Sequence, residues 1–191
     1  MAQKTSPYGG VFESVLKYWR IYGGWRDLLR SPYFHVSVAL VAITADSWIN
    51  DKWWLTVTAV VPNLLGFTLG GFAIFLGFGD ERFKTIIAGN DASDDGHSPY
   101  LTVSATFMHF VVIQILALLW AIAGGALYFD SPWPQFAGLF RWLGVLGGMV
   151  GYWLFIYGVC LAAAAGFAIF RVAGWYDEFQ TRNKPRQNGT E

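Results

Sequence analysis

The chain has 191 residues, and its 13 basic and 13 acidic side chains balance, so the net charge gives no sign of a nucleic-acid partner. Hydrophobic residues make up 54% of it, and a single cysteine, Cys160, excludes an intramolecular disulfide. One cysteine also excludes the four-helix disulfide-generating membrane oxidoreductases, which need pairs of cysteines.

Four long apolar stretches alternate with short polar connections along the chain. They cover about residues 33–50, 53–79, 101–129 and 143–170. Each comes close to, or exceeds, the roughly 20 apolar residues that a helix needs to cross a hydrocarbon core. The remaining polar residues are too few to cover four such segments in water. The sequence therefore predicts an all-α, polytopic membrane protein with four transmembrane helices.

Residues 1–32 precede the first apolar stretch and are expected to contain an amphipathic helix over residues 11–22. Its apolar side carries Phe12, Val15, Leu16 and Trp19. Its polar side carries Glu13, Lys17 and Arg20. Such a helix lies along the headgroup plane of a bilayer. Two roles are open: a movable surface helix that couples lipid or partner binding to the bundle, or a passive anchor.

Basic residues are unevenly distributed around the four stretches. Lys52 and Arg141 lie on one side of the predicted bundle, and all other Lys and Arg residues lie on the opposite side. Because short loops rich in Lys and Arg stay in the cytoplasm, we expect both termini to be cytoplasmic. The predicted organisation is a cytoplasmic N-terminal segment, a four-helix domain over residues 33–171 and a partly disordered cytoplasmic tail over residues 172–191. We expect a cell-membrane location, of the bacterial inner-membrane type.

The second stretch has an unusual distribution of small residues around its helix. At about 100° per residue, one side carries Thr56, Ala59, Asn63, Gly66, Gly70, Ala73 and Gly77, named here the small-residue stripe. The bulky side carries Val61, Leu65, Phe72, Phe75 and Leu76. Gly66 and Gly70 have the spacing that lets two membrane helices approach closely. The stripe is either a tight helix–helix contact or the wall of a narrow pore in an oligomer, with Asn63 as its constriction.

The fourth stretch also gathers small residues on one side. They include Gly144, Gly147, Gly148 and Gly151. Burial of glycine in lipid gains little from solvent exclusion, so shape matching between helices must supply the association. We expect these glycines to pack against another helix, within one subunit or between subunits.

Polar side chains at membrane depth are costly and indicate function. At about 1.5 Å per residue, Asn63 lies about 15 Å inward from Trp53, and His109 lies about 12 Å inward from Leu101. Both are expected near the midplane, where they are candidates for a hydrogen-bonded gate or a proton-sensitive element. The alternative is a neutral histidine bonded to an amide or a carbonyl. Gln114 is expected to bond between helices.

Three charged residues follow the second stretch: Asp80, Glu81 and Arg82. Mixed charges at the end of a helix form local ion pairs in water. If the second helix lines a pore, Asp80 and Glu81 instead form an acidic ring at its inner mouth, which favours cations.

The sequence holds no nucleophile–base pair, no cluster of metal ligands and no phosphate loop, so we expect no enzyme activity, metal or cofactor. The leading hypothesis is a homo-oligomeric, channel-like protein of the lipid bilayer with the second helix at its centre. One alternative is a non-conducting membrane sensor or scaffold that recruits a cytosolic protein partner. Another is a small transporter.

Overall fold

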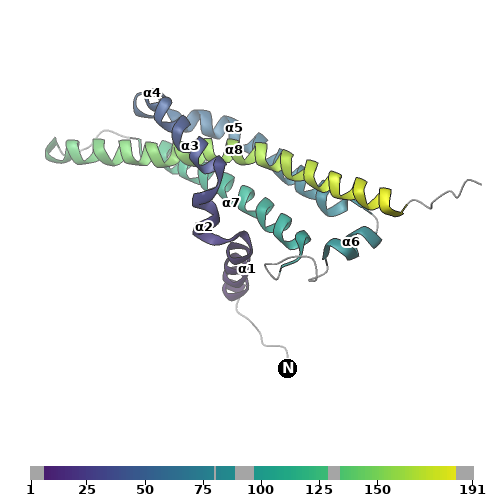
Figure 1. Cartoon of the computed structure of the whole chain (residues 1–191). Coiled ribbons are helices and arrows are strands. Elements are labelled where there is room, and N and C mark those ends of the chain that lie inside the picture. Colours follow the sequence, from purple (N-terminus) through teal and green to yellow (C-terminus); the bar gives the residue numbers. More distant parts are fainter. Residues whose placement is uncertain (1–6, 80, 89–96, 129–133, 184–191) are drawn as a thin grey trace, which may run out of the picture.

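The computed structural model describes residues 7–79, 81–88, 97–128 and 134–183. In these residues the chain is helical throughout, apart from short turns (Figure 1). The helices are α1 (Pro7–Tyr22), α2 (Gly24–Arg30), α3 (Pro32–Ile43), α4 (Ala45–Ile49), α5 (Trp53–Gly77), α6 (Glu81–Ala88), α7 (Pro99–Ala126), the 3-10 turn η2 (Pro134–Phe136) and α8 (Ala137–Asn183).

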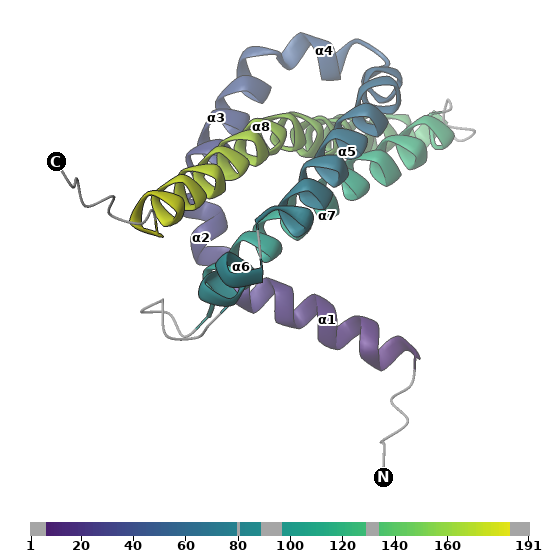
Figure 2. The same cartoon turned by 90° about the vertical axis from the view of Figure 1, so that its right-hand side faces the viewer.

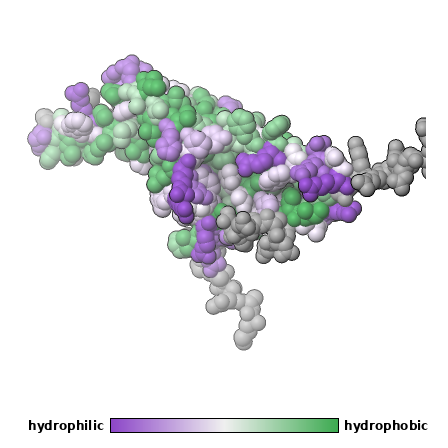
Figure 3. Space-filling view, in the orientation of Figure 1, coloured by the Kyte–Doolittle hydropathy of each residue, from purple (hydrophilic) through white to green (hydrophobic). Residues whose placement is uncertain are grey.

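Three helices, α5, α7 and α8, are long and apolar enough to cross a membrane. Figure 3 shows hydrophobic residues over most of the length of the long helices, with hydrophilic residues gathered around α4 and near the end of α8. These properties are those of a membrane protein, as the sequence predicted. With 47 residues, α8 is about 70 Å long at the usual rise per residue. It begins before the expected stretch 143–170 and continues beyond it.

The first apolar stretch differs from the expected single helix over residues 33–50. The apolar helix α3 has only 12 residues, and the chain turns at Thr44 before α4. The Thr44 hydroxyl donates a 2.7 Å hydrogen bond to the Leu40 carbonyl. The turn also frees the Val41 carbonyl, which accepts a 3.0 Å hydrogen bond from the Trp48 indole. The Leu40 carbonyl also keeps its bond from the Thr44 backbone N–H, so the Trp48 indole alone replaces a helical donor lost at the break. The hydropathy pattern does not reveal this break.

The long helices share one aromatic and aliphatic core. α5 and α7 lie side by side, α8 packs on both, and α3 packs on α8 (Figure 2). The most deeply buried core side chains are Val57, Val61, Phe107, Ala117, Ala121, Tyr157, Leu161 and Ala165. At one end of the bundle, the Trp53 ring lies against Gly124, Gly148 and Gly151.

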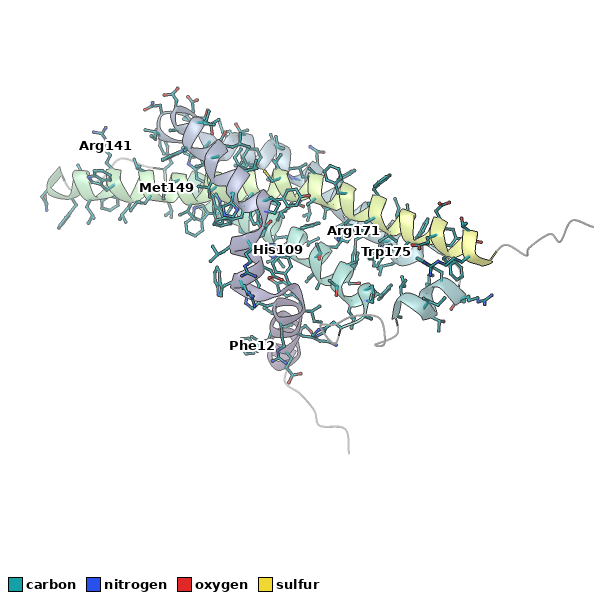
Figure 4. The ribbon with its side chains drawn as sticks, in the orientation of Figure 1. Phe12, His109, Arg141, Met149, Arg171 and Trp175 are labelled. Carbon is teal, nitrogen blue, oxygen red and sulfur yellow. The ribbon has the colours of Figure 1, made fainter. Side chains whose placement is uncertain are left out.

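α1 lies outside this bundle and crosses α7 at a steep angle (Figures 1 and 2). Its helical region includes the predicted residues 11–22 and begins earlier, at Pro7. Val11, Phe12, Val15 and Leu16 on its apolar side are exposed, and Phe12 projects from the helix in Figure 4. The bundle therefore does not cover the apolar side of α1.

At the end of the bundle where α8 ends, α6 packs through two buried residues, Phe83 and Ile87. The Phe83 ring meets Tyr176 and Phe179 of α8 at centroid distances of 5.1 and 5.6 Å. Gly79 makes the preceding turn with φ of +82°, a conformation that favours glycine. Residues 172–183, expected in a partly disordered tail, are helical in α8, and residues 184–191 lie outside the described residues.

Candidate functional site

The small-residue stripe of α5 is exposed along its whole length. All seven of its residues are exposed, and a Cβ atom added at Gly66, Gly70 or Gly77 would meet nothing within 4 Å. The residues of α5 that pack into the bundle lie on the other side: Trp53, Val57, Val61, Thr68, Gly71 and Phe75. The stripe therefore makes no close helix contact within one subunit.

Large side chains also lie on the exposed side of α5. Phe67 and Ile74 project beside the stripe and are 57% and 60% exposed. On the expected bulky side, Val61 and Phe75 are buried, but Leu76 remains 41% exposed. The stripe is thus a strip of small residues with exposed large side chains beside it.

Asn63 is exposed within the stripe, and its amide donates a 3.2 Å hydrogen bond to the Ala59 carbonyl one turn earlier. That bond leaves the amide oxygen and the second amide proton without a partner from the described residues. The predicted Asn63–His109 contact is wrong, because the two helices turn these residues to different sides. Asn63 faces away from the bundle, whereas His109 faces α1 and α8.

His109 is 1% exposed, on the side of α7 that faces α1 and α8 (Figure 4). Its Nε2 atom lies 3.2 Å from the Tyr157 hydroxyl of α8, within hydrogen-bond distance. The Tyr22 ring, at the end of α1, stacks on the imidazole with centroids 4.0 Å apart and planes 18° apart. His109 therefore joins three helices, and its Nδ1 atom has no hydrogen-bond partner among the described residues.

The contacts continue from His109 to α3. Tyr157 stacks on Trp153 with a centroid distance of 5.6 Å. The Trp153 indole donates a 3.1 Å hydrogen bond to the Ser37 hydroxyl, which in turn donates 2.7 Å to the Phe34 carbonyl. We name Tyr22, Ser37, His109, Trp153 and Tyr157 the His109 cluster. It links the N-terminal helix to α3, α7 and α8.

Tyr22 is half-buried where α1 ends against α7. Burial raises the pKa of the Tyr22 phenol above its ordinary value near 10.0. Tyr22 is therefore protonated at physiological pH and acts in the cluster as a neutral aromatic ring.

A second polar contact lies between α5 and α7. The Gln114 amide donates a 3.0 Å hydrogen bond to the Thr68 hydroxyl, and both residues are fully buried. This is the interhelical hydrogen bond that the sequence predicted for Gln114. Such bonds hold membrane helices together because lipid offers no alternative partner.

The glycines of α8 divide into two groups. Gly148 and Gly151 are buried, and a Cβ atom at Gly151 would collide with the rings of Trp53 and Trp120. Gly144 and Gly147 have open space around their Cα atoms, although the Gly147 carbonyl accepts a 2.9 Å hydrogen bond from Trp120. Of these four glycines, only Gly148 and Gly151 therefore pack closely within one subunit.

The expected inner-mouth charges are only partly described. Glu81 and Arg82 begin α6 and are exposed, whereas Asp80 lies outside the described residues. Within the described residues, Glu81 and Arg82 form no ion pair with each other.

Sequence reasoning missed Tyr22 and Tyr157 as partners of His109. The sequence did allow Tyr157 to be predicted. A short connection between α7 and α8 implies that they run antiparallel, which brings position 109 opposite the middle of α8. Comparisons with protein-family models, with curated protein sequences and with solved structures find no match to the chain.

Proposed function

We propose that the chain is the subunit of a homo-oligomeric, channel-like protein of the bacterial inner membrane, with the small-residue stripe of α5 facing its centre. In this arrangement both termini lie in the cytoplasm and the chain crosses the bilayer four times. The observation that carries the proposal is the complete exposure of the stripe, Asn63 included, on the side of α5 opposite the bundle.

Besides α5, α7 and α8, this proposal needs one more crossing, which precedes α5 in the chain. It is made by the short helices α2, α3 and α4 instead of one continuous helix. Tyr22 ends α1 beside His109, and the Trp48 backbone lies beside Gly148 at the other end of the bundle. α2, α3 and α4 therefore carry the chain from one level to the other. The hydrogen bonds of Thr44 and Trp48 at the break support this path, because backbone groups at membrane depth require partners within the protein.

Exposure of the stripe supports assembly of several copies. An amide such as that of Asn63 is costly against lipid tails, but not against water or another amide. Small residues let helices from neighbouring copies approach each other, and the Asn63 side chains then line a common axis. A single bundle is too small to enclose a hydrated pore, so the proposed pore requires several copies with α5 at their centre.

The chemistry of the pore would favour cations. α6 begins with Glu81 a few residues after the end of α5, so a ring of copies places one exposed carboxylate per subunit near the inner mouth. Asp80 precedes it in the sequence and adds a second carboxylate to the proposed ring.

Conductance across planar bilayers tests this function. Purified full-length protein is expected to carry cation current, and Asn63→Leu is expected to change the single-channel conductance because it removes the polar constriction. Leu116→Ala, at an exposed position of α7 at similar depth, serves as the control and should leave the current unchanged. Absence of current from the correctly folded protein would contradict the channel.

A membrane sensor is the second candidate, and the stacking of Tyr22 on His109 favours it. In that case α1 responds to a cytosolic protein partner, and the His109 cluster transmits its position to the bundle. Neutralisation of Arg26 and Arg30, both exposed on α2, is then expected to weaken partner binding without any effect on conductance. Unchanged binding by the doubly neutralised protein would argue against the sensor.

A further inference from the structure

A groove lies between α1 and helices α5 and α7. Its volume is about 280 Å³, and its lining includes Lys17 and Ile21 of α1, Phe72 of α5, and Leu101, Ser104 and Met108 of α7. α1 contacts α7 closely at its end, where Tyr22 stacks on His109. The groove thus lies between the body of α1 and the bundle.

The lining combines one cation with apolar walls. Lys17 is exposed, and within the described residues it has no ion-pair partner. The Ser14 and Ser104 hydroxyls at the groove donate their protons to backbone carbonyls. They can therefore accept a hydrogen bond from a ligand but cannot donate one. A ligand that satisfies this groove carries negative charge at one end and hydrocarbon at the other. A free inorganic anion would leave the apolar walls uncovered.

A second groove repeats this combination at the junction of α1 and α2. It has a volume of about 390 Å³ and is lined by Leu16, Trp19, Arg20, Gly23 and Gly24. Arg20, like Lys17, has no ion-pair partner within the described residues. Cations therefore stand beside apolar surface on both sides of α1.

The surroundings of α1 indicate where the ligand comes from. The apolar side of α1 is not covered by the bundle: its exposed residues are Val11, Phe12, Val15 and Leu16. A basic helix of this kind lies at headgroup depth, where lipid phosphates and the first methylenes of the acyl chains are its neighbours. Anionic lipid is the component of that layer that matches Lys17 in charge.

We propose that the groove between α1 and helices α5 and α7 binds one anionic phospholipid, with its phosphate against Lys17 and an acyl chain along Phe72, Leu101 and Met108. The bound lipid fills the space under α1 and holds this helix against α7. Its binding depends on the position of α1 and does not depend on whether the protein conducts, so a failed conductance test leaves it unaffected.

Native mass spectrometry of the full-length protein tests the proposal. Delipidated protein in detergent is titrated with phosphatidylglycerol or with phosphatidylcholine of the same chains. One phosphatidylglycerol is expected to bind per subunit in preference to phosphatidylcholine. Lys17→Gln is expected to weaken that binding about fivefold, the scale of one cation near an anionic lipid. Lys84→Gln, which removes a lysine outside the groove, is the matched control and should have no effect.

A second variant tests the apolar walls. Met108→Trp places a bulky indole ring in the groove in place of a flexible thioether. The position is 43% exposed, so the bundle should still fold, with an unchanged melting temperature. Loss of bound phosphatidylglycerol in this variant supports the site. Equal binding of the two lipids, equal effects of Lys17→Gln and Lys84→Gln, or displacement of the lipid by millimolar inorganic phosphate alone would each overturn the proposal.

Discussion

Tyr22 and His109 form the closest ring contact across the α1–α7 boundary, with centroids 4.0 Å apart. The contact places an aromatic ring of the N-terminal helix directly on a buried imidazole of the bundle. Offset-stacked rings contribute about 0.5–1.5 kcal/mol beyond the apolar area that they bury. The position of α1 on the bundle therefore depends strongly on one residue at its end.

Replacement of Tyr22 tests that dependence. Tyr22→Ala removes the stack on His109 together with the apolar contact of the phenol ring. We expect the free energy of local opening of α1 to fall by about 1–2 kcal/mol, so its amides exchange roughly tenfold faster. Hydrogen exchange of residues 7–22 measures the change. Phe12→Ala, an exposed substitution in the same helix, is the control, and equal exchange in the two variants would contradict the account.

Two glycines give opposite predictions at the residue scale. Gly151→Ala forces a methyl group against Trp53 and Trp120, and overpacking of this kind costs about 1–3 kcal/mol. Gly66→Ala adds a methyl group to open space, so the stability of a single subunit should stay unchanged. Unfolding of the purified protein in detergent measures both. A Gly151→Ala protein as stable as the Gly66→Ala protein would contradict the packing described here.

At the scale of the elements, the break between α3 and α4 is the main departure from regular helices. The Val41 carbonyl loses its helical donor at the turn and accepts the Trp48 indole instead. A buried carbonyl without a donor costs about 1–3 kcal/mol, so the indole N–H has an energetic role beyond the apolar area of the ring. The break lets the chain turn into α4 and reach the start of α5.

Trp48→Phe removes this donor while it keeps an aromatic ring. We expect the free energy of unfolding to fall by about 1 kcal/mol, with the change centred on α3 and α4. Thermal unfolding in detergent gives the total, and hydrogen exchange of residues 32–49 locates it. Trp25→Phe, which alters an exposed indole, controls for the general effect of losing a tryptophan. If the two variants have the same melting temperature, the bond to Val41 has no structural role.

Long apolar helices can be recognised from their length and composition alone. The hydropathy pattern therefore located α5, α7 and the apolar part of α8 within a few residues. The turn at Thr44 escaped it because Thr44 and Trp48 are compatible with a continuous helix and only their hydrogen bonds reveal the break. Helical periodicity likewise identified the small-residue stripe on α5. It gave depths for Asn63 and His109 but no relative rotation of the helices, so the predicted contact between them was wrong.

At the scale of the whole molecule, α5 has a packed side and an open side. The packed side holds Val57, Val61 and Phe75, whereas the open side holds the small-residue stripe with Asn63. α8 uses the same type of residue differently, since its Gly148 and Gly151 already pack on Trp53. A second copy of the chain packed on the α5 stripe would cover its small residues, as Trp53 covers Gly148 and Gly151 of α8 within the subunit.

Cysteine cross-linking in native membranes measures this assembly most directly. The background is Cys160→Ala, which removes the single native thiol. Thr56→Cys places a thiol in the stripe near the start of α5, and Ile122→Cys places one on an exposed position near the end of α7, at similar depth. Oxidation is predicted to give a covalent dimer for Thr56→Cys and a monomer for Ile122→Cys. A monomer from both variants, or a dimer from Ile122→Cys alone, would contradict an oligomer built around the α5 stripe.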